Sequence, residues 1–285
     1  TVQPYSPAAG SGLSSHELNQ PGAYKEISDT SIVAQFKCKK EGLSNELINL
    51  YPFYFLAWTT TPWTLPSNTA LTIGKKINYS FIKTYNQYTK DKITVVLATK
   101  LVDKIFSKNF FEVKSETELN SFDKNQSKIP FLKFHELLGE DLENINYERI
   151  WDESPLPLDN PENAFRIISG DFVTTEDGTG IVHTAPTFGA DDYKAAKNAN
   201  PEVPPLQVFD KNGNKVPIVD LKGKFIEGIG LVSGKYVKND YYDSNSVPEK
   251  SVDVEIAIRL KELNLAFKVE KYSHSYPHCW RTDKP

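Results

Sequence analysis

Apolar residues at every second position are the clearest pattern in the chain, and they predict strands more often than helices. Ile32, Ala34, Phe36 and Cys38 recur in this way, which is typical of a half-buried strand. The continuous apolar run 53–58 instead suits a strand that is buried on both faces. Further strands are expected at residues 69–73, 79–83, 93–98, 165–169 and 180–184.

Helices are predicted in only three places. Residues 251–263 give the strongest signal, because Val252, Ile256, Leu260 and Leu263 fall on one helical face. The other two helices are expected at residues 99–106 and 190–198. The pattern therefore favours an α/β fold that is dominated by strands, with a closed or barrel-like β core and peripheral helices.

Composition divides the chain into a core and less regular parts. Residues 1–25 are rich in Ser, Gly, Pro and Ala and are expected to form an irregular lead-in. Residues 107–164 are polar and rich in Asn and Lys, which favours a peripheral insertion. Asn212-Gly213 predicts a tight hairpin turn between two short strands. The 285 residues suit one large domain or two small ones.

Charge and cysteine content narrow the functional classes. The formal net charge of −4 argues against a domain that grips nucleic acid through a broad basic face. No apolar run approaches the roughly 20 residues of a membrane span. Cys38 and Cys279 give no disulfide framework, so we expect a cytoplasmic protein. Methionine is absent even at position 1, from which we expect a segment of a larger protein.

Common catalytic signatures are missing. His16-Glu17 and His135-Glu136 lack the second histidine that a zinc protease helix requires. The chain has no Gly-x-Ser-x-Gly elbow and no complete glycine-rich nucleotide loop. Near the end, His274, His278 and Cys279 could supply three zinc ligands, but no fourth ligand follows. We therefore expect neither a metal nor a cofactor.

Two polar segments remain, Thr59–Asn68 and Gly178–Tyr193, and each follows a predicted strand. Each also has a plain structural explanation, since threonine favours strands and a lone His183 is often structural. Together they could deliver hydroxyls, an imidazole and the Asp192 carboxylate to one pocket. A carboxylate there could hold an ammonium group, while threonine and asparagine side chains could hydrogen-bond a ribose or position a water.

These two segments closely resemble the signature segments of the editing domain of isoleucyl-tRNA synthetase. Residues Ile32–Phe36 and His274–Arg281 also match that family, so the resemblance spans most of the chain. The related leucyl and valyl enzymes have an Arg-Pro-Glu-Thr type of sequence where this chain has Thr61-Pro-Trp-Thr64. The polar residues 107–164 look more like the eukaryotic cytosolic form than the compact bacterial one.

The resemblance implies hydrolysis of valine that has been wrongly joined to the isoleucine tRNA, and it leaves hydrolysis of valyl-adenylate open as a second activity. It implies that Asp192 anchors the α-ammonium group of the substrate and that His183 crowds the side-chain pocket. Thr60 and Asn68 would lie along the terminal adenosine and the attacking water. Three further residues would line the pocket: Thr59, Thr61 and Trp63. No protein nucleophile is apparent, so catalysis by Thr60, His183 and Asp192 would rest on orientation and electrostatics.

The resemblance also implies partners, which are the valine-bearing 3′ end of tRNA(Ile) and the remainder of the synthetase. Residues 268–285 would return the chain toward the catalytic domain, whose signatures are missing here, so aminoacylation is not expected. Many family members carry Cys-x-x-Cys where this chain has Cys279 and Thr282. We expect a monomer without membrane contacts. Two alternatives stay open: a non-catalytic module that binds the tRNA acceptor end, and an unrelated esterase or amidase.

Overall fold

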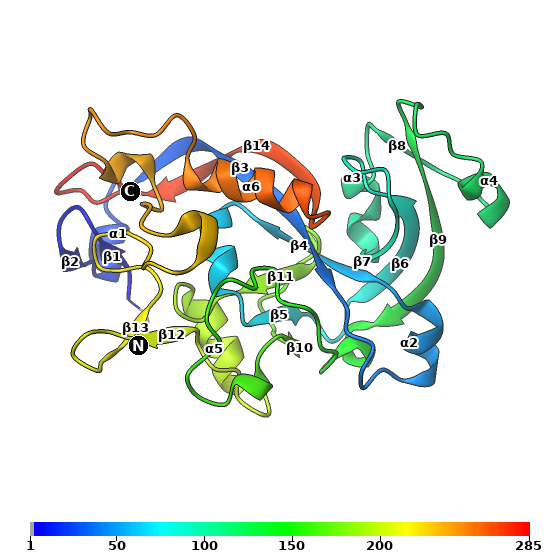
Figure 1. Cartoon of the computed structure of the whole chain (residues 1–285), viewed down its shortest axis with the longest axis horizontal. Coiled ribbons are helices and arrows are strands. Elements are labelled where there is room, and N and C mark those ends of the chain that lie inside the picture. The colour runs from blue at the N-terminus through cyan, green and yellow to red at the C-terminus, as the bar shows by residue number, and fades with distance from the viewer. Residues whose placement is uncertain (1–2) are drawn as a thin grey trace.

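The predicted strands join one mixed sheet in the computed structural model, which describes residues 3–285 (Figure 1). Within that range ten strands pair in the order β10-β5-β11-β4-β7-β6-β9-β8, with β3 added to β4 and β14 added to β3. The ten strands are β3 (Tyr24–Lys37), β4 (Tyr54–Thr59), β5 (Ala70–Ile73), β6 (Asn78–Tyr85), β7 (Lys92–Ala98), β8 (Phe110–Glu112), β9 (Ile129–Leu138), β10 (Arg166–Ser169), β11 (Ile181–Thr184) and β14 (Ala266–Pro277).

Helices are short and lie around this sheet, and within residues 3–285 there are six where the sequence predicted three. They are α1 (Ser15–Leu18), α2 (Asn45–Leu50), α3 (Val102–Ile105), α4 (Glu116–Asn120), α5 (Ala190–Asn198) and α6 (Val252–Glu262). In α6 the predicted apolar face is buried at Val252, Ile256 and Leu260, but Leu263 lies beyond the helix and is exposed. Within residues 3–285, every helix is too short or too polar to cross a lipid bilayer.

The strand β3 is more deeply buried than its alternating pattern predicted. Residues 30–36 are all buried, whereas a half-buried strand would expose every second side chain. The reason is that both faces carry a core. Ile32 and Phe36 pack in the larger apolar cluster, while Val33 packs in a second cluster on the other side. Cys38 falls just after the strand and forms an isolated bridge with Tyr147.

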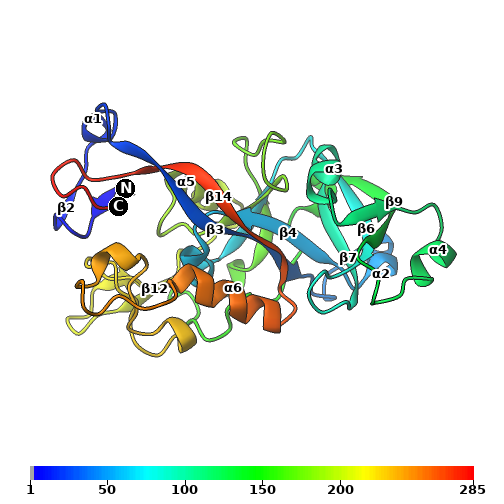
Figure 2. The same ribbon diagram turned by 90° about the horizontal axis from the view of Figure 1, so that it is seen from above.

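A long two-stranded ribbon of β3 and β14 runs along one side of the molecule (Figure 2). Pairing extends from Ala266 opposite Ala34 to Pro277 opposite Tyr24. The segment 268–285 therefore begins within β14, which runs antiparallel beside β3. Helix α6 packs against both strands of the ribbon and against η1 (Pro62–Ser67). This short helical turn contains most of Thr59–Asn68, which we call the threonine segment.

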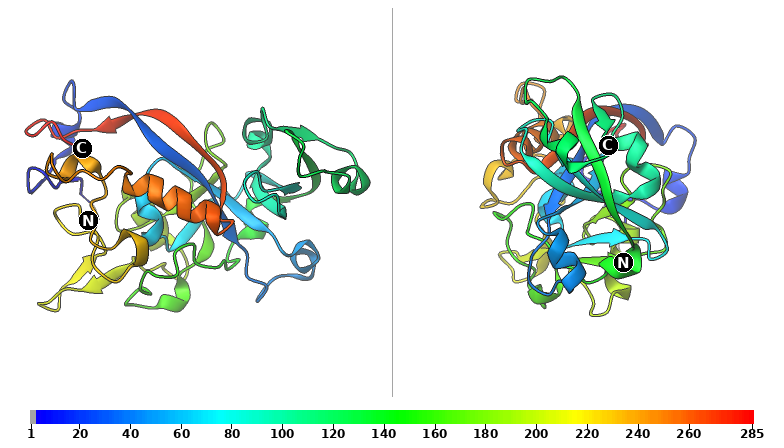
Figure 3. Two further views of the ribbon diagram at one scale, coloured as in Figure 1. Left: turned by 45° about the horizontal axis from the view of Figure 1, so that its top comes forward. Right: turned by 90° about the vertical axis from the view of Figure 1, so that its right-hand side faces the viewer.

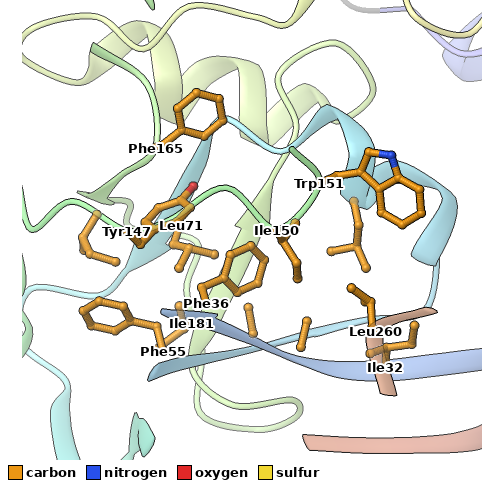
Figure 4. Packing of buried hydrophobic residues seen from close by; sticks show 14 of the residues in the cluster. Ile32, Phe36, Phe55, Leu71, Tyr147, Ile150, Trp151, Phe165, Ile181 and Leu260 are labelled. Carbon is orange, nitrogen blue, oxygen red and sulfur yellow. The ribbon is translucent and has the colours of Figure 1, made fainter. Parts of the chain in front are cut away.

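The expectation of a purely peripheral insertion at 107–164 is wrong for much of that segment. β8 and α4 do lie at the far end of the molecule (Figure 3), but β9 pairs with β6 in the main sheet. Residues beyond β9 enter the main core, where Tyr147 is fully buried and packs edge-on against Phe36 at 5.4 Å between ring centroids (Figure 4). The apolar residues of segment 107–164 are few and lie among polar ones, so the sequence did not reveal that part of this segment belongs to the core.

The lead-in also has local structure where it is described. Residues 1–2 lie outside the described range, but β1 (Tyr5–Ser6) pairs with β2 (Ser11–Gly12), and α1 begins at a Ser14 capping box. The hairpin predicted at Asn212-Gly213 is confirmed, since β12 (Gln207–Phe209) and β13 (Lys215–Pro217) are antiparallel.

Candidate active site

The structure brings the two polar segments together at one edge of the sheet. β4 and β11 run parallel, with Val182 opposite Trp58, so their carboxyl ends lie side by side. β4 continues into the threonine segment Thr59–Asn68, and β11 continues through a turn into α5. Hydroxyls from the first segment and the His183 ring from the second therefore reach the same place.

Within the threonine segment, three of the hydroxyls hold the turn itself. The Thr61 N–H donates to Thr59 Oγ1 at 3.0 Å, and the Thr64 hydroxyl donates to the Thr61 carbonyl at 2.8 Å. Pro62 occupies the first position of η1, where no backbone N–H is needed. Thr60 differs, because its hydroxyl has no hydrogen-bond partner within residues 3–285 and is free to meet a ligand or a water.

The imidazole of His183 is held on both sides. Nδ1 lies 2.8 Å from the Asn68 amide nitrogen, and Nε2 lies 3.0 Å from the Thr64 hydroxyl. An amide nitrogen only donates, so Nδ1 accepts, and Nε2 carries the proton that it donates to Thr64. Burial lowers the pKa of His183 to about 4, so the ring is neutral at physiological pH. With both nitrogens engaged, His183 can form a wall of the pocket but is not placed to act as a general base.

Asn68 does not lie where the resemblance implied. It is only 4% exposed, does not line the main cavity, and sits behind His183. Its amide nitrogen also donates to the Ala70 carbonyl at 2.8 Å, and its carbonyl oxygen accepts from the Tyr147 hydroxyl at 2.7 Å. Asn68 therefore supports the imidazole and makes no direct contact with the cavity.

Asp192 lies in the first turn of α5 with its carboxylate directed to the end of β11. Its Oδ2 accepts a hydrogen bond from the Ala185 N–H at 2.8 Å. Burial raises the pKa of Asp192 to about 6, and the neighbouring charge of Asp191 adds to this effect. A bound cation would favour the ionised form again. Gly189 leaves the necessary room, because an added Cβ there would lie 2.6 Å from Asp192 Cγ.

A cavity of about 990 Å³ opens where these segments meet. Six of the predicted site residues line it: Thr59, Thr60, Thr61, Trp63, His183 and Asp192. Trp63 packs edge-on against Phe188, with 5.0 Å between ring centroids. Nε1 of Trp63 and the hydroxyl of Thr187 are buried in this wall without a hydrogen-bond partner in the part of the chain that the structure describes.

Sequence analysis missed Asp253, which supports the site from α6. Its Oδ1 accepts a hydrogen bond from the backbone N–H of Trp63 at 2.9 Å, and its Oδ2 lies 3.8 Å from Lys238 Nζ. Burial raises the pKa of Asp253 to about 7, and the Lys238 charge opposes this shift. Lys238 also pairs with Asp29 on the ribbon at 2.7 Å. In the sequence, Asp253 looks like an ordinary helix first-turn charge, so only the distant contacts identify it.

The histidines near the end of the chain have other partners than a metal. His274 Nε2 lies 3.2 Å from Asp29 Oδ2, and His278 Nδ1 donates to the Tyr276 carbonyl at 3.0 Å. Among residues 3–285, no three His, Cys, Asp or Glu side chains come together in a way that could hold a metal ion.

Comparisons with known proteins show which sequences and folds this chain is similar to. No family model matches the chain. The chain is 49% identical over its whole length to the isoleucine–tRNA ligase of Bacteroides fragilis (strain YCH46) and 50% identical to that of Cytophaga hutchinsonii. Its relatives are isoleucine–tRNA ligases. The enzyme of Clostridium tetani is 36% identical over 99% of the chain. The chain spans about a quarter of the length of the first two relatives and 21% of the third.

Solved structures with the same fold are editing domains of a related synthetase. GlLeuRS-CP1 aligns with a TM-score of 0.53 at 15% identity, covering 84% of this chain and 99% of that one. The editing domain of cytosolic leucyl-tRNA synthetase from P. knowlesi has the same TM-score at 10% identity, covering 90% and 99%. The strand-dominated α/β class is therefore confirmed. The expected eukaryotic cytosolic form is not supported, because the isoleucine–tRNA ligases found here are bacterial.

Proposed function

We propose that this chain is the editing domain of an isoleucyl-tRNA synthetase and hydrolyses valine from mischarged tRNA(Ile). The observation that carries the proposal is the cavity at the paired ends of β4 and β11. It brings a carboxylate, a neutral imidazole and threonine hydroxyl groups to one place. The relatives and the fold support the same activity, although they leave the substrate open.

Asp192 supplies the group that recognises an amino-acid ester. A valyl ester carries an α-ammonium group, and a carboxylate whose pKa is raised to about 6 by burial gains most from such a partner. The Ala185 N–H bond fixes the carboxylate direction before the substrate arrives. Asp192 therefore orients the ester by its charge.

His183 supplies the discrimination by size. The residue is 7% exposed, and its ring cannot move aside without losing its bonds to Asn68 and Thr64. A single pocket discriminates one methylene by about two orders of magnitude at most, a limit for which isoleucyl-tRNA synthetases are the usual example. A second pocket that valine enters and isoleucine does not removes the remaining errors.

Hydrolysis needs a positioned water and no covalent intermediate with the protein. Water adds to the ester carbonyl, the bond to the ribose oxygen breaks, and free valine leaves the tRNA with its hydroxyl restored. Thr60 lines the cavity, and in this proposal its hydroxyl orients that water or the ribose. The neighbouring ribose hydroxyl of the substrate assists. Orientation and preorganised dipoles supply the rate enhancement.

The remaining volume of the cavity suits the terminal nucleoside of the tRNA. Its wall away from the strand ends includes Val219, Leu221 and Tyr241, an apolar and aromatic surface that a base can contact. The net charge of −4 gives the chain little general attraction for a polyanion. Most of the affinity for tRNA would then come from the rest of the synthetase.

The alternative, a module that binds the acceptor end without catalysis, would keep the same pocket. Single-turnover deacylation of Val-tRNA(Ile) separates the two, since a binding module would slow the spontaneous hydrolysis of the ester. We also expect N-acetyl-Val-tRNA(Ile), which lacks the ammonium charge, to be hydrolysed about two orders of magnitude more slowly than Val-tRNA(Ile). Equal rates for the two esters would remove Asp192 from its proposed role.

Asp192→Ala should slow the hydrolysis of Val-tRNA(Ile) by about two orders of magnitude as well. Asp191→Ala is the matched control, because Asp191 lies in the same helical turn but is exposed, and its one ion pair within residues 3–285 is with Lys194. If both variants lost activity equally, the effect would be one of general charge and not of substrate anchoring.

A further inference from the structure

A buried chain of hydrogen bonds connects the cavity wall to a tyrosine that does not line the cavity. The Tyr147 hydroxyl donates to Asn68 Oδ1 at 2.7 Å, and Asn68 Nδ2 lies 2.8 Å from His183 Nδ1. His183 Nε2 is 3.0 Å from the Thr64 hydroxyl, which donates to the Thr61 carbonyl at 2.8 Å. None of these side chains is more than 8% exposed where it takes part in the chain of bonds.

The direction of every bond in this chain is determined by its two ends. A phenol that donates to Asn68 fixes Oδ1 as the acceptor, and the Ala70 carbonyl fixes Nδ2 as the donor. Nδ1 of His183 must then accept. At the other end, the Thr64 hydroxyl donates its proton to the Thr61 carbonyl, so it must accept a hydrogen bond from His183 Nε2. Both ends require the same tautomer of His183.

We propose that Tyr147 is a positioning residue for specificity, because its hydroxyl holds the Asn68 amide in place and, through that amide, the plane of the His183 ring. The proposal rests on the proposed function, in which the His183 ring excludes the larger side chain. Tyr147 does not touch the substrate. Its effect is to keep the imidazole in one orientation, since a different orientation of the ring would enlarge the pocket.

The surroundings of Tyr147 suit this role. The residue is fully buried and packs edge-on against Phe36, while its backbone N–H donates to the Phe165 carbonyl (Figure 4). Burial raises the pKa of its hydroxyl well above the ordinary value, so the phenol keeps its proton at any working pH. A rigid and permanently protonated donor is what a fixed amide orientation requires.

Removal of the hydroxyl would release the chain of bonds at its far end. In Tyr147→Phe, Asn68 Oδ1 loses its partner in a site that excludes water, and an unpaired buried acceptor is unfavourable. The Ala70 carbonyl still holds Nδ2, so we expect the amide to tilt rather than to turn over. The tilt would weaken the bond from Nδ2 to His183 Nδ1 and leave the plane of the ring less firmly held.

The test uses the 285-residue chain labelled with ¹⁵N and long-range correlation spectra of the histidine rings at pH 7.5. The His183 signals are those missing from His183→Gln. We expect the wild type to show a single neutral form with the proton on Nε2. Tyr147→Phe should shift or split these signals and lower the ratio of Val-tRNA(Ile) to Ile-tRNA(Ile) hydrolysis about 3- to 10-fold.

Tyr79→Phe is the matched control. Tyr79 is equally buried, and its hydroxyl donates to the Gly180 carbonyl at 2.7 Å without touching His183. It should leave the His183 signals and the ratio unchanged. Asn68→Ala provides a second variant that should also release the ring if Tyr147→Phe folds poorly.

Three results would overturn the proposal: a proton on Nδ1 in the wild type, unchanged ring signals in both Tyr147→Phe and Asn68→Ala, or equal effects of Tyr147→Phe and Tyr79→Phe. The proposed function fails separately, if His183→Ala leaves the hydrolysis ratio unchanged. The ring spectra would still decide whether Tyr147 fixes the imidazole in that case.

Discussion

Replacement of Asp192 by asparagine is expected to make the chain more stable and nearly inactive. Burial raises the pKa of this carboxyl to about 6 from its ordinary value of 3.8. The folded state therefore binds the proton more tightly than the unfolded state does. Asparagine keeps an oxygen that can accept the Ala185 N–H bond and removes the charge that is unfavourable in the empty pocket.

The size of the effect follows from the shift in pKa. About two units correspond to about 3 kcal/mol as an upper limit. Because the cavity admits water to part of the side chain, we expect about 1–2 kcal/mol at pH 7.5. Because the pKa of this acid is raised in the folded state, ionisation of Asp192 lowers the free energy of unfolding. The wild type is least stable, relative to the variant, above pH 6, and it recovers stability as pH falls from 6 toward 3.8.

The assay is urea unfolding of both proteins at pH 7.5 and pH 4.5, together with deacylation of Val-tRNA(Ile). The stability difference should shrink to less than half at the lower pH. Asp191→Asn changes the net charge equally at an exposed position and should stabilise the chain far less, because it removes only the repulsion that Asp191 adds to the effect of burial on Asp192. A variant at Asp192 that is no more stable than wild type at pH 7.5, or that keeps its activity, would refute the reasoning.

Three further predictions concern the surroundings of the pocket. Gly189→Ala should lower deacylation about tenfold or more with little loss of stability, since its Cβ would displace the Asp192 carboxylate; unchanged single-turnover rates would contradict this. Asp253→Ala leaves the Trp63 N–H unpaired and should reduce the free energy of unfolding by about 1–3 kcal/mol in urea titrations, a prediction that a change below about 0.5 kcal/mol would exclude. Elemental analysis of the active chain should find no stoichiometric zinc, and chelation should not abolish deacylation, because the cysteine and histidines near the end lack a fourth ligand.

The sequence predicted the site at the level of segments because strands and their turns are locally encoded. The threonine segment and the His183 segment each follow a strand, and parallel pairing of β4 with β11 then places their ends together. α5 also begins where the aspartates suggested. These features need only periodicity, proline and glycine signals, and helix-end charges.

The supporting residues could not be predicted in the same way, because their roles depend on contacts between distant parts of the chain. Tyr147 lies 79 positions from Asn68 in a segment whose polarity suggested a periphery. Asp253 lies 190 positions from Trp63. β3 was misjudged for the same reason, since only the folded sheet shows that a second apolar cluster covers its other face. Local sequence patterns do not identify contacts between residues that lie far apart in the chain.

The most direct test of the central claim is the ratio of two rates: deacylation of Val-tRNA(Ile) and of Ile-tRNA(Ile) by this chain under single-turnover conditions. The wild type should hydrolyse the valyl ester faster by a factor on the order of tens to hundreds, which is the value of one methylene against a fixed wall. His183→Ala, compared at matched folded fraction, should narrow that ratio mainly by accelerating loss of isoleucine. Equal rates for the two esters in the wild type, or a ratio that His183→Ala leaves unchanged, would contradict the account.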